Sequence, residues 1–260
     1  MNGPWSKAFK GQPLVGISGD GKYQQNFNAG TTLYGPKLFA RQHADYGGGK
    51  FDPHTGQAYE IGGGVLNITA YKDEKGDVRC GNVQTVTIDQ AGSGAPMTTA
   101  NSFSQAGGYW EAKIRFPRAQ GTWGGFWLLS PDDPKSRGHL ELDVIEYYGE
   151  GDAKGHHHSF HRWHYAGQKD VHSSHYTGVP ELADFKWHTH GVDLRGISEL
   201  DGRKAVVFYQ DRKEVARFAA DDEFFQSRFY WLLTLNMQAP VKPEYTLPQT
   251  MQVDYVRVWR

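Results

Sequence analysis

Cysteine is almost absent from the sequence, because Cys80 is the only one among 260 residues. An intramolecular disulfide is therefore excluded, and a lone Cys at an unremarkable position is more often inert packing than a nucleophile. Excess charge of either sign is absent too, since 28 Lys and Arg residues stand against 29 Asp and Glu residues. We therefore expect no nucleic-acid partner, because such a partner is attracted by a strong positive field.

Long apolar runs are also missing. Residues 1–12 lack the apolar stretch of a signal peptide, and no run approaches the roughly 20 residues of a membrane span. We expect a monomer that has no membrane contact and works in the extracellular or periplasmic space, with no signal peptide in the sequence as given.

Helical periodicity is scarce, and residues 180–185 and 221–227 each offer no more than a turn or two. Glycine, aromatic residues and short alternating segments between turns are plentiful, which is the pattern of a sandwich or barrel. The strand-like segments are 64–71, 107–117, 124–130, 140–148, 205–218, 229–237 and 251–260. No linker or repeat divides the chain, so we predict one all-β domain over residues 1–260.

The run GHLELDVIEYYGE, residues 138–150, sets three carboxylates into a strand-like segment. Strict alternation puts Glu141 and Asp143 on one face but turns Glu146 into the core, where an uncompensated carboxylate is expensive. One extra residue at Val144–Ile145, a β-bulge, would return Glu146 to the face of the other two acids, and bulges are common beside active sites. The sequence therefore predicts a bulge there and three acids on one face.

A pair of carboxyl groups across a scissile bond is what glycoside hydrolysis needs. One stays protonated to give the leaving oxygen a proton, and the other is ionised to attack or to position water. Asp143, between Glu141 and Glu146, would tune the pKa values of both through its charge and hydrogen bonds. The competing interpretation is an exposed strand face with scattered acids, and the parity break at Glu146 argues against it.

These residues also carry a family resemblance. ELDVIE, residues 141–146, resembles the E-x-D-x-x-E signature of glycoside hydrolase family 16, in the bulged form of laminarinases and related endo-glycanases. Segments 107–130, 186–196 with 206–215, and 251–260 resemble the strand pair before the catalytic strand, the hairpin after it and the closing strand of that family. The resemblance covers roughly residues 60–260, and residues 1–58 match poorly.

The resemblance implies an all-β, concanavalin-like jelly-roll sandwich of two antiparallel sheets with a concave substrate cleft. It assigns Glu141 as nucleophile, Asp143 as its electrostatic helper and Glu146 as general acid/base. The implied activity is endo-acting, retaining hydrolysis, by double displacement, of internal β-linkages in a β-glucan (β-1,3 or mixed β-1,3-1,4) or a related exopolysaccharide. The family's usual Pro-Ala is replaced by Gly124–Gly125, and the segment after the catalytic strand is unusually basic.

Three alternatives stay open beside this function. The same mechanism would serve on a galactan such as agar, carrageenan or porphyran, and a sugar in place of water would make the protein a transglycosylase. A jelly-roll lectin would bind the same polysaccharides without cutting them, but sugar binding alone requires no nucleophile and acid on one strand.

Sugar rings stack on aromatic faces, so we expect a polysaccharide groove lined by Trp with polar residues at its edge. By the resemblance, Trp123 and Trp127 contribute to the cleft near the cleaved bond. The further candidates for substrate contact are Trp163, Trp231, Asn236 and Gln238.

The histidine-rich stretch GHHHSFHRWHY, residues 155–165, follows the acids. His157 and His161 match an H-x-x-x-H-like strand of the family that contacts the substrate or the acid. The alternatives are an exposed surface, or a zinc site formed by His157 or His158 with His161. A weaker idea is that His156, His158, Arg162 and His164 favour a substrate with carboxylate or sulfate groups.

A metal is also implied on the convex face. Asp254 and the backbone of Gly64 match positions that hold a structural calcium in many family members. One carboxylate plus carbonyls is a small ligand set for calcium, and a plain surface Asp explains the residue equally well. We expect no cofactor for catalysis itself.

Overall fold

The structure, a computed structural model, describes residues 45–52, 57–85, 103–130, 138–164, 169–176 and 184–260. It also describes the backbone of three short strands before them: β1 (Gly16–Ile17), β2 (Tyr23–Asn26) and β3 (Phe39–Ala40). The helix expected over 221–227 is confirmed as α1 (Asp222–Gln226), the one helix in the described part of the chain. Residues 180–183 lie outside the described residues.

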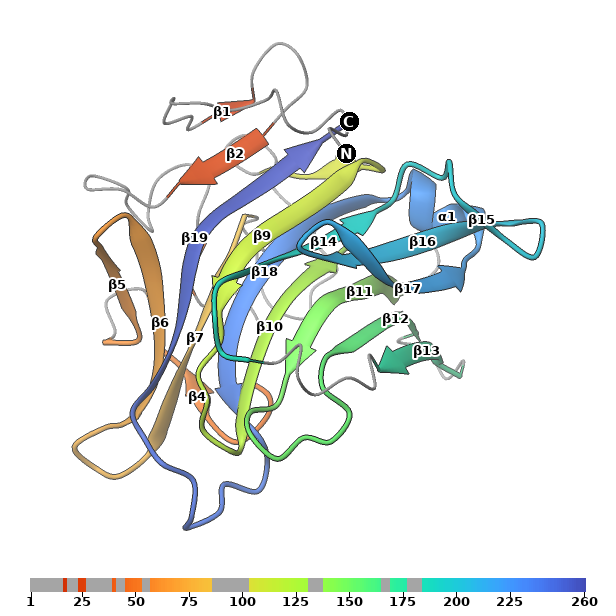
Figure 1. The fold of residues 1–260 in the computed structure, drawn as a ribbon. Coiled ribbons are helices and arrows are strands. Elements are labelled where there is room, and N and C mark those ends of the chain that lie inside the picture. The colour runs from red at the N-terminus through yellow and green to blue at the C-terminus, as the bar shows by residue number, and fades with distance from the viewer. Residues whose placement is uncertain are drawn as a thin grey trace.

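The strands form two sheets that lie one over the other (Figure 1). The first sheet runs β5 (Tyr59–Gly62), β6 (Val65–Lys72), β19 (Gln249–Trp259), β9 (Tyr109–Arg115), β14 (His188–Asp193), β16 (Arg203–Gln210) and β17 (Lys213–Ala219), with β2 beside the end of β19 and β1 beside β2. The second sheet runs β7 (Val78–Gln84), β18 (Arg228–Met237), β10 (Thr122–Leu129), β11 (Gly138–Tyr147), β12 (His157–His164) and β13 (Val171–Tyr176), with β3 on β7.

The pairing is antiparallel throughout, except that β4 (Lys50–Phe51) runs parallel to β7. Two further short strands are β8 (Gln105–Ala106), which pairs with the start of β18, and β15 (Glu199–Leu200), which pairs with the start of β16. Strands β2 to β4 join both sheets from the poorly matched part of the sequence. A single domain over residues 1–260 stays a prediction.

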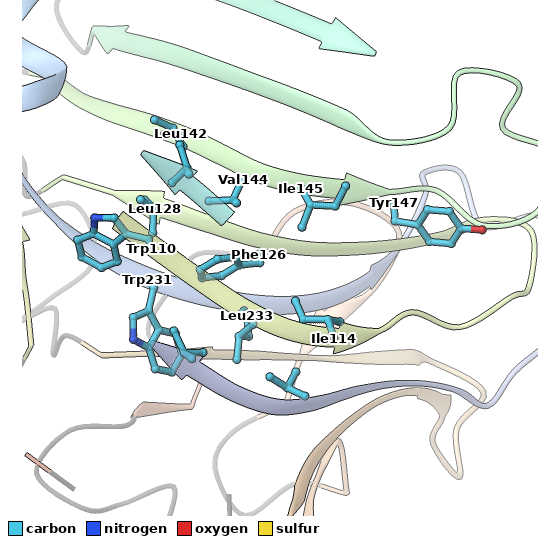
Figure 2. Close-up of a cluster of buried hydrophobic side chains, with 14 of the residues drawn as sticks. Trp110, Ile114, Phe126, Leu128, Leu142, Val144, Ile145, Tyr147, Trp231 and Leu233 are labelled. Carbon is cyan, nitrogen blue, oxygen red and sulfur yellow. The ribbon is translucent and has the colours of Figure 1, made fainter. Parts of the chain in front are cut away.

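The core lies between the two sheets. Trp110 and Ile114 of the first sheet point toward Phe126, Leu128 and Leu142 of the second, and all five are fully buried (Figure 2). β-Branched and aromatic residues fit this pleated surface. Because each such side chain contributes about 1.5–3 kcal/mol when buried, this core fixes which face of every strand points away from it.

The bulge predicted in β11 is confirmed. The register of β11 against β12 is regular up to Asp143 and resumes at Glu146, and the register against β10 shifts at the same place. Both Val144 and Ile145 are buried in the core, so the extra residue is accommodated on the apolar side (Figure 2). Beyond the bulge, Tyr147 also points into the core, and Glu146 therefore faces the same side as Glu141.

Candidate active site

A cavity of about 410 Å³ opens on the side of the second sheet that faces away from the core. It is lined by Tyr46, Trp123, Gly125, Trp127, Glu141, Asp143, Glu146, Tyr148, His161, Trp163 and Thr234. We call it the acid cavity, because it brings together all three acids singled out in the sequence. Strands β10, β11, β12 and β18 supply most of its wall.

Each glutamate of the acid cavity accepts hydrogen bonds from aromatic side chains. The indole N–H of Trp163 donates to Oε2 of Glu141 over 3.1 Å. On Glu146, Oε1 accepts the indole N–H of Trp123 at 2.7 Å and the hydroxyl of Tyr148 at 3.0 Å. These bonds fix the direction of both carboxyl groups into the cavity.

Asp143 lies between the two glutamates and is held by β12. Its Oδ2 accepts the hydroxyl of Ser159 at 2.6 Å and lies 3.0 Å from Nε2 of His161. The same Nε2 is 3.9 Å from Oε1 of Glu141. His161 therefore joins the acids, as the sequence predicted for a histidine of this strand.

Burial and, after it, the charge of Asp143 raise the pKa of Glu146 to about 7, against the hydrogen bonds of Trp123 and Tyr148. Burial, followed by the charge of Asp143, also raises the pKa of Glu141 well above its ordinary value, and the N–H of Trp163 opposes this shift. The two glutamates hold on to protons because ionising either of them beside the charge of Asp143 is costly. A carboxyl group with a pKa near neutrality is suited to general acid catalysis.

Tyr46 completes the cavity from a loop that the sequence did not single out. Its ring packs edge-on against Trp123 at 5.3 Å and Trp127 at 6.4 Å. Asn236 holds this loop, since its amide donates to the carbonyl of Tyr46 and its Oδ1 accepts the backbone N–H of Gly49 at 3.1 Å. Asn236 is fully buried by these contacts, so its predicted role in substrate contact is wrong.

Trp231 was predicted as a substrate contact, and this prediction is wrong. Its side chain is fully buried in the core between the sheets (Figure 2). Its neighbours Tyr230 and Leu232 take the opposite face of β18 and pack with Trp127. Strand parity decides this, whereas the argument for Trp231 rested on its residue type.

His157 and Gln238 lie beside the acid cavity and not in it. They line a second cavity of about 360 Å³, which shares Tyr148 with the first. His157 pairs with Asp152, Nε2 to Oδ2, at 2.5 Å, and the Gln238 amide donates to the carbonyl of Tyr148 at 3.1 Å. Contact of these two residues with a long substrate stays a prediction.

Gly124 and Gly125, which replace the usual Pro-Ala of the family, have different structural roles. Gly125 pairs with Glu146 and lines the acid cavity, and a Cβ there would meet Trp127 Cδ1 at 3.6 Å, which is ordinary contact. At Gly124 a Cβ would lie 2.7 Å from Phe116 Cδ1, too close for a side chain. The absence of a side chain at Gly124 thus lets Phe116 pack directly against the backbone of β10. At Gly125, the absence of a side chain leaves open space in the acid cavity beside Glu146.

The zinc alternative finds no support in the described residues. Among them, the one group of three with atoms close enough for an ion is Glu141, Asp143 and His161, within 4.8 Å of one another. Hydrogen bonds within the acid cavity account for that closeness without an ion. His157 bonds Asp152 instead, and the His158 ring is buried with Nδ1 2.8 Å from the carbonyl of Val144.

The residues expected to hold calcium do not fit that role. Oδ2 of Asp254 lies 2.7 Å from the ammonium of Lys113, which supplies the positive charge that a calcium ion would bring. Gly64 stands in the turn between β5 and β6 with φ at +82°, a conformation that glycine adopts readily. Asp254 is thus explained as the partner of a lysine.

Trp123→Phe is expected to raise the pKa of Glu146 by up to about one pH unit. The reason is that the lost indole N–H stabilises the ionised carboxylate. The measurement is the pH titration of the Glu146 carboxyl carbon by NMR. Trp187→Phe is the control, because Trp187 contacts Lys113 and Arg115 outside the cavity. An unchanged or lowered pKa of Glu146 in Trp123→Phe would contradict this assignment.

The fold and the cavity together define the class of the protein, a jelly-roll β-sandwich that carries an acid pair in an aromatic cavity. The family model described as "Glycosyl hydrolases family 16" matches residues 66–234. The chain therefore belongs to glycosyl hydrolase family 16, which confirms the resemblance seen in the sequence.

Two curated relatives come from Rhizobium meliloti (strain 1021), and both are named endo-1,3-1,4-beta-glycanases. They are 28% and 25% identical over 204 residues, which is 77% of this chain and 39% of each relative. The chain thus spans about two fifths of the length of the curated relatives it matches.

Solved structures confirm the predicted fold. A laminarinase from Flavobacterium sp. UMI-01 matches 92% of this chain and 99% of its own, with TM-score 0.62 and 16% identity. A family 16 protein of Bacteroides ovatus, in complex with a product, matches 91% and 99%, with TM-score 0.65 and 16% identity. A protein of Mycobacterium tuberculosis described as a pseudo beta-1,3-glucanase matches 91% and 97%, with TM-score 0.64 and 21% identity. The activity must therefore be argued from the site and not from the fold.

Proposed function

We propose that the protein is an endo-acting, retaining glycoside hydrolase of a β-glucan, with β-1,3 or mixed β-1,3-1,4 linkages, or of a related exopolysaccharide. The observation that carries the proposal is the bulge in β11, which puts Glu141, Asp143 and Glu146 into one aromatic cavity. The names of the two curated relatives support the substrate class.

In the proposed mechanism Glu141 attacks the anomeric carbon, and Glu146 gives its proton to the leaving oxygen. The result is a glycosyl ester on Glu141. Water then attacks this ester while the ionised Glu146 takes a proton from the water, which restores both side chains. The charge of Glu146 is one cause of the raised pKa of Glu141, so a proton on Glu146 favours the ionised nucleophile. Asp143, bonded by Ser159 and His161, keeps a negative charge beside the developing positive charge of the sugar.

The aromatic side chains of the acid cavity are the reason for proposing a polysaccharide as the substrate. Trp123, Trp127, Trp163 and Tyr46 supply the faces on which sugar rings stack.

The described residues include no helix long and apolar enough to cross a bilayer. We propose that the protein acts as a monomer in the extracellular or periplasmic space, where such polymers are met.

The test is incubation with laminarin, lichenan, agarose and an acidic exopolysaccharide, followed by measurement of new reducing ends and of oligosaccharide size. We expect internal cleavage of laminarin or lichenan, with the β-anomer of the new reducing end seen first by NMR. Cleavage of agarose and of none of the other polymers would show that the substrate is a galactan and not a β-glucan. Binding to the polymers without any product would leave a lectin, and a first product of inverted configuration would contradict the role of Glu141.

A further inference from the structure

Three aromatic rings from β12 and β13 form a cluster behind the acids: His161, Trp163 and His172. His172 lies directly across from His161 in the register of the two strands. The His172 ring centroid is 4.8 Å from that of His161 and 4.9 Å from that of Trp163, and the latter two rings stack at 5.4 Å. His172 is not part of the wall of the acid cavity, but it contacts two residues that are.

The two histidines are joined by a short hydrogen bond, with Nδ1 of His161 2.6 Å from Nδ1 of His172. One of these nitrogens must carry a proton and the other must offer a lone pair. The other nitrogen of His161, Nε2, faces the carboxylate of Asp143 at 3.0 Å. A carboxylate accepts hydrogen bonds, so Nε2 of His161 carries the proton.

Ser159 supports the same assignment. Its Oγ is 2.6 Å from Oδ2 of Asp143, to which it donates, and it lies 3.1 Å from Nε2 of His161. With its own hydrogen used on Asp143, Ser159 can only accept from His161. When His161 is neutral with its proton on Nε2, it has a lone pair on Nδ1, which accepts the Nδ1–H of His172.

We propose that His172 is a positioning residue for the proposed hydrolytic reaction, on which this inference rests. Its Nδ1–H holds His161 in the tautomer that donates to Asp143, and its ring holds Trp163, which donates to Glu141. Without this donor, only Asp143 and Ser159 favour the proton on Nε2 of His161, and the preference for this tautomer weakens. In the tautomer protonated at Nδ1, a lone pair faces the Asp143 carboxylate, and the repulsion displaces Asp143.

The activity test compares His172→Ala, His172→Asn and His175→Ala on the polymer that the wild-type protein cleaves. The amide nitrogen of Asn reaches the place of Nδ1 and restores a donor to His161. We expect His172→Ala to lower kcat about tenfold with KM within about twofold, and His172→Asn to recover most of that loss. His175→Ala is the matched control, because His175 is an exposed histidine on the same strand whose ring contacts Phe218.

The tautomer is measured separately by NMR of protein labelled with ¹⁵N-histidine. We expect His161 to be protonated at Nε2 in the wild-type protein and to show a weaker preference for this tautomer in His172→Ala. The proposal is overturned by a wild-type His161 protonated at Nδ1 alone, by His172→Ala with the kcat of His175→Ala, or by His172→Asn no more active than His172→Ala. The NMR measurement needs no turnover, so an inactive wild-type protein would refute the proposed function while the tautomer is still decided.

Discussion

Glu141→Gln and Glu146→Gln are each expected to lose nearly all activity, with kcat/KM on a polymeric β-glucan falling by about 10³–10⁴-fold. Glutamine keeps the volume of the side chain but has no nucleophilic carboxylate and no proton to give to a leaving oxygen. The measurement is the rate of reducing-end formation. Glu60→Gln is the matched control, because Glu60 is exposed on β5 of the other sheet.

The two roles are separated by azide and an aryl β-glycoside with a good leaving group. In Glu146→Ala the glycosyl ester on Glu141 still forms, and azide attacks it to give a β-glycosyl azide. In Glu141→Ala azide enters from the side of the missing carboxylate and gives an α-glycosyl azide. Products with the opposite configurations would exchange the roles of the two glutamates.

The acid strand was predictable because its constraint is local. Glu146 is out of phase with Glu141 and Asp143, and a buried charge is so costly that only a bulge fits the sequence. The same counting finds Tyr148, which follows Glu146 by two residues and donates to it. Side chains on one strand share a face by parity, and parity is visible in a sequence.

The rest of the site depends on which strands lie side by side, and this is not a local property. Tyr46 enters the cavity from a loop far from Glu141 in sequence, and His172 reaches His161 only through the register of β12 with β13. Trp231 and Asn236 were misjudged for a related reason. Parity groups Trp231 with one face of β18, but which face of that strand is buried in the core is set by the sheet packed against it. Asn236 is covered by the loop at residue 46.

Glu146→Gln is expected to stabilise the folded protein by about 1–3 kcal/mol above pH 7, and to leave its stability nearly unchanged below about pH 4.5. Burial, followed by the charge of Asp143, raises the pKa of Glu146 from its ordinary 4.5 to about 7, so the folded protein binds this proton more tightly than the unfolded chain does. The stability that this proton contributes is fully present below the pKa of Glu146 in the unfolded chain. It is lost as the pH rises through the higher pKa of Glu146 in the folded protein. Glutamine is neutral at every pH and escapes the loss.

The measurement is urea unfolding of the wild-type protein, Glu146→Gln and the control Glu60→Gln at pH 4.5 and pH 8.5. A gain for Glu146→Gln that is equal at both pH values would come from shape or hydrogen bonding, and would contradict the raised pKa. A gain confined to pH 8.5 would show that the folded protein bears a destabilising charge at Glu146. The same raised pKa keeps a proton available to the leaving oxygen near neutral pH, so the variant that gains stability is the one expected to lose catalysis.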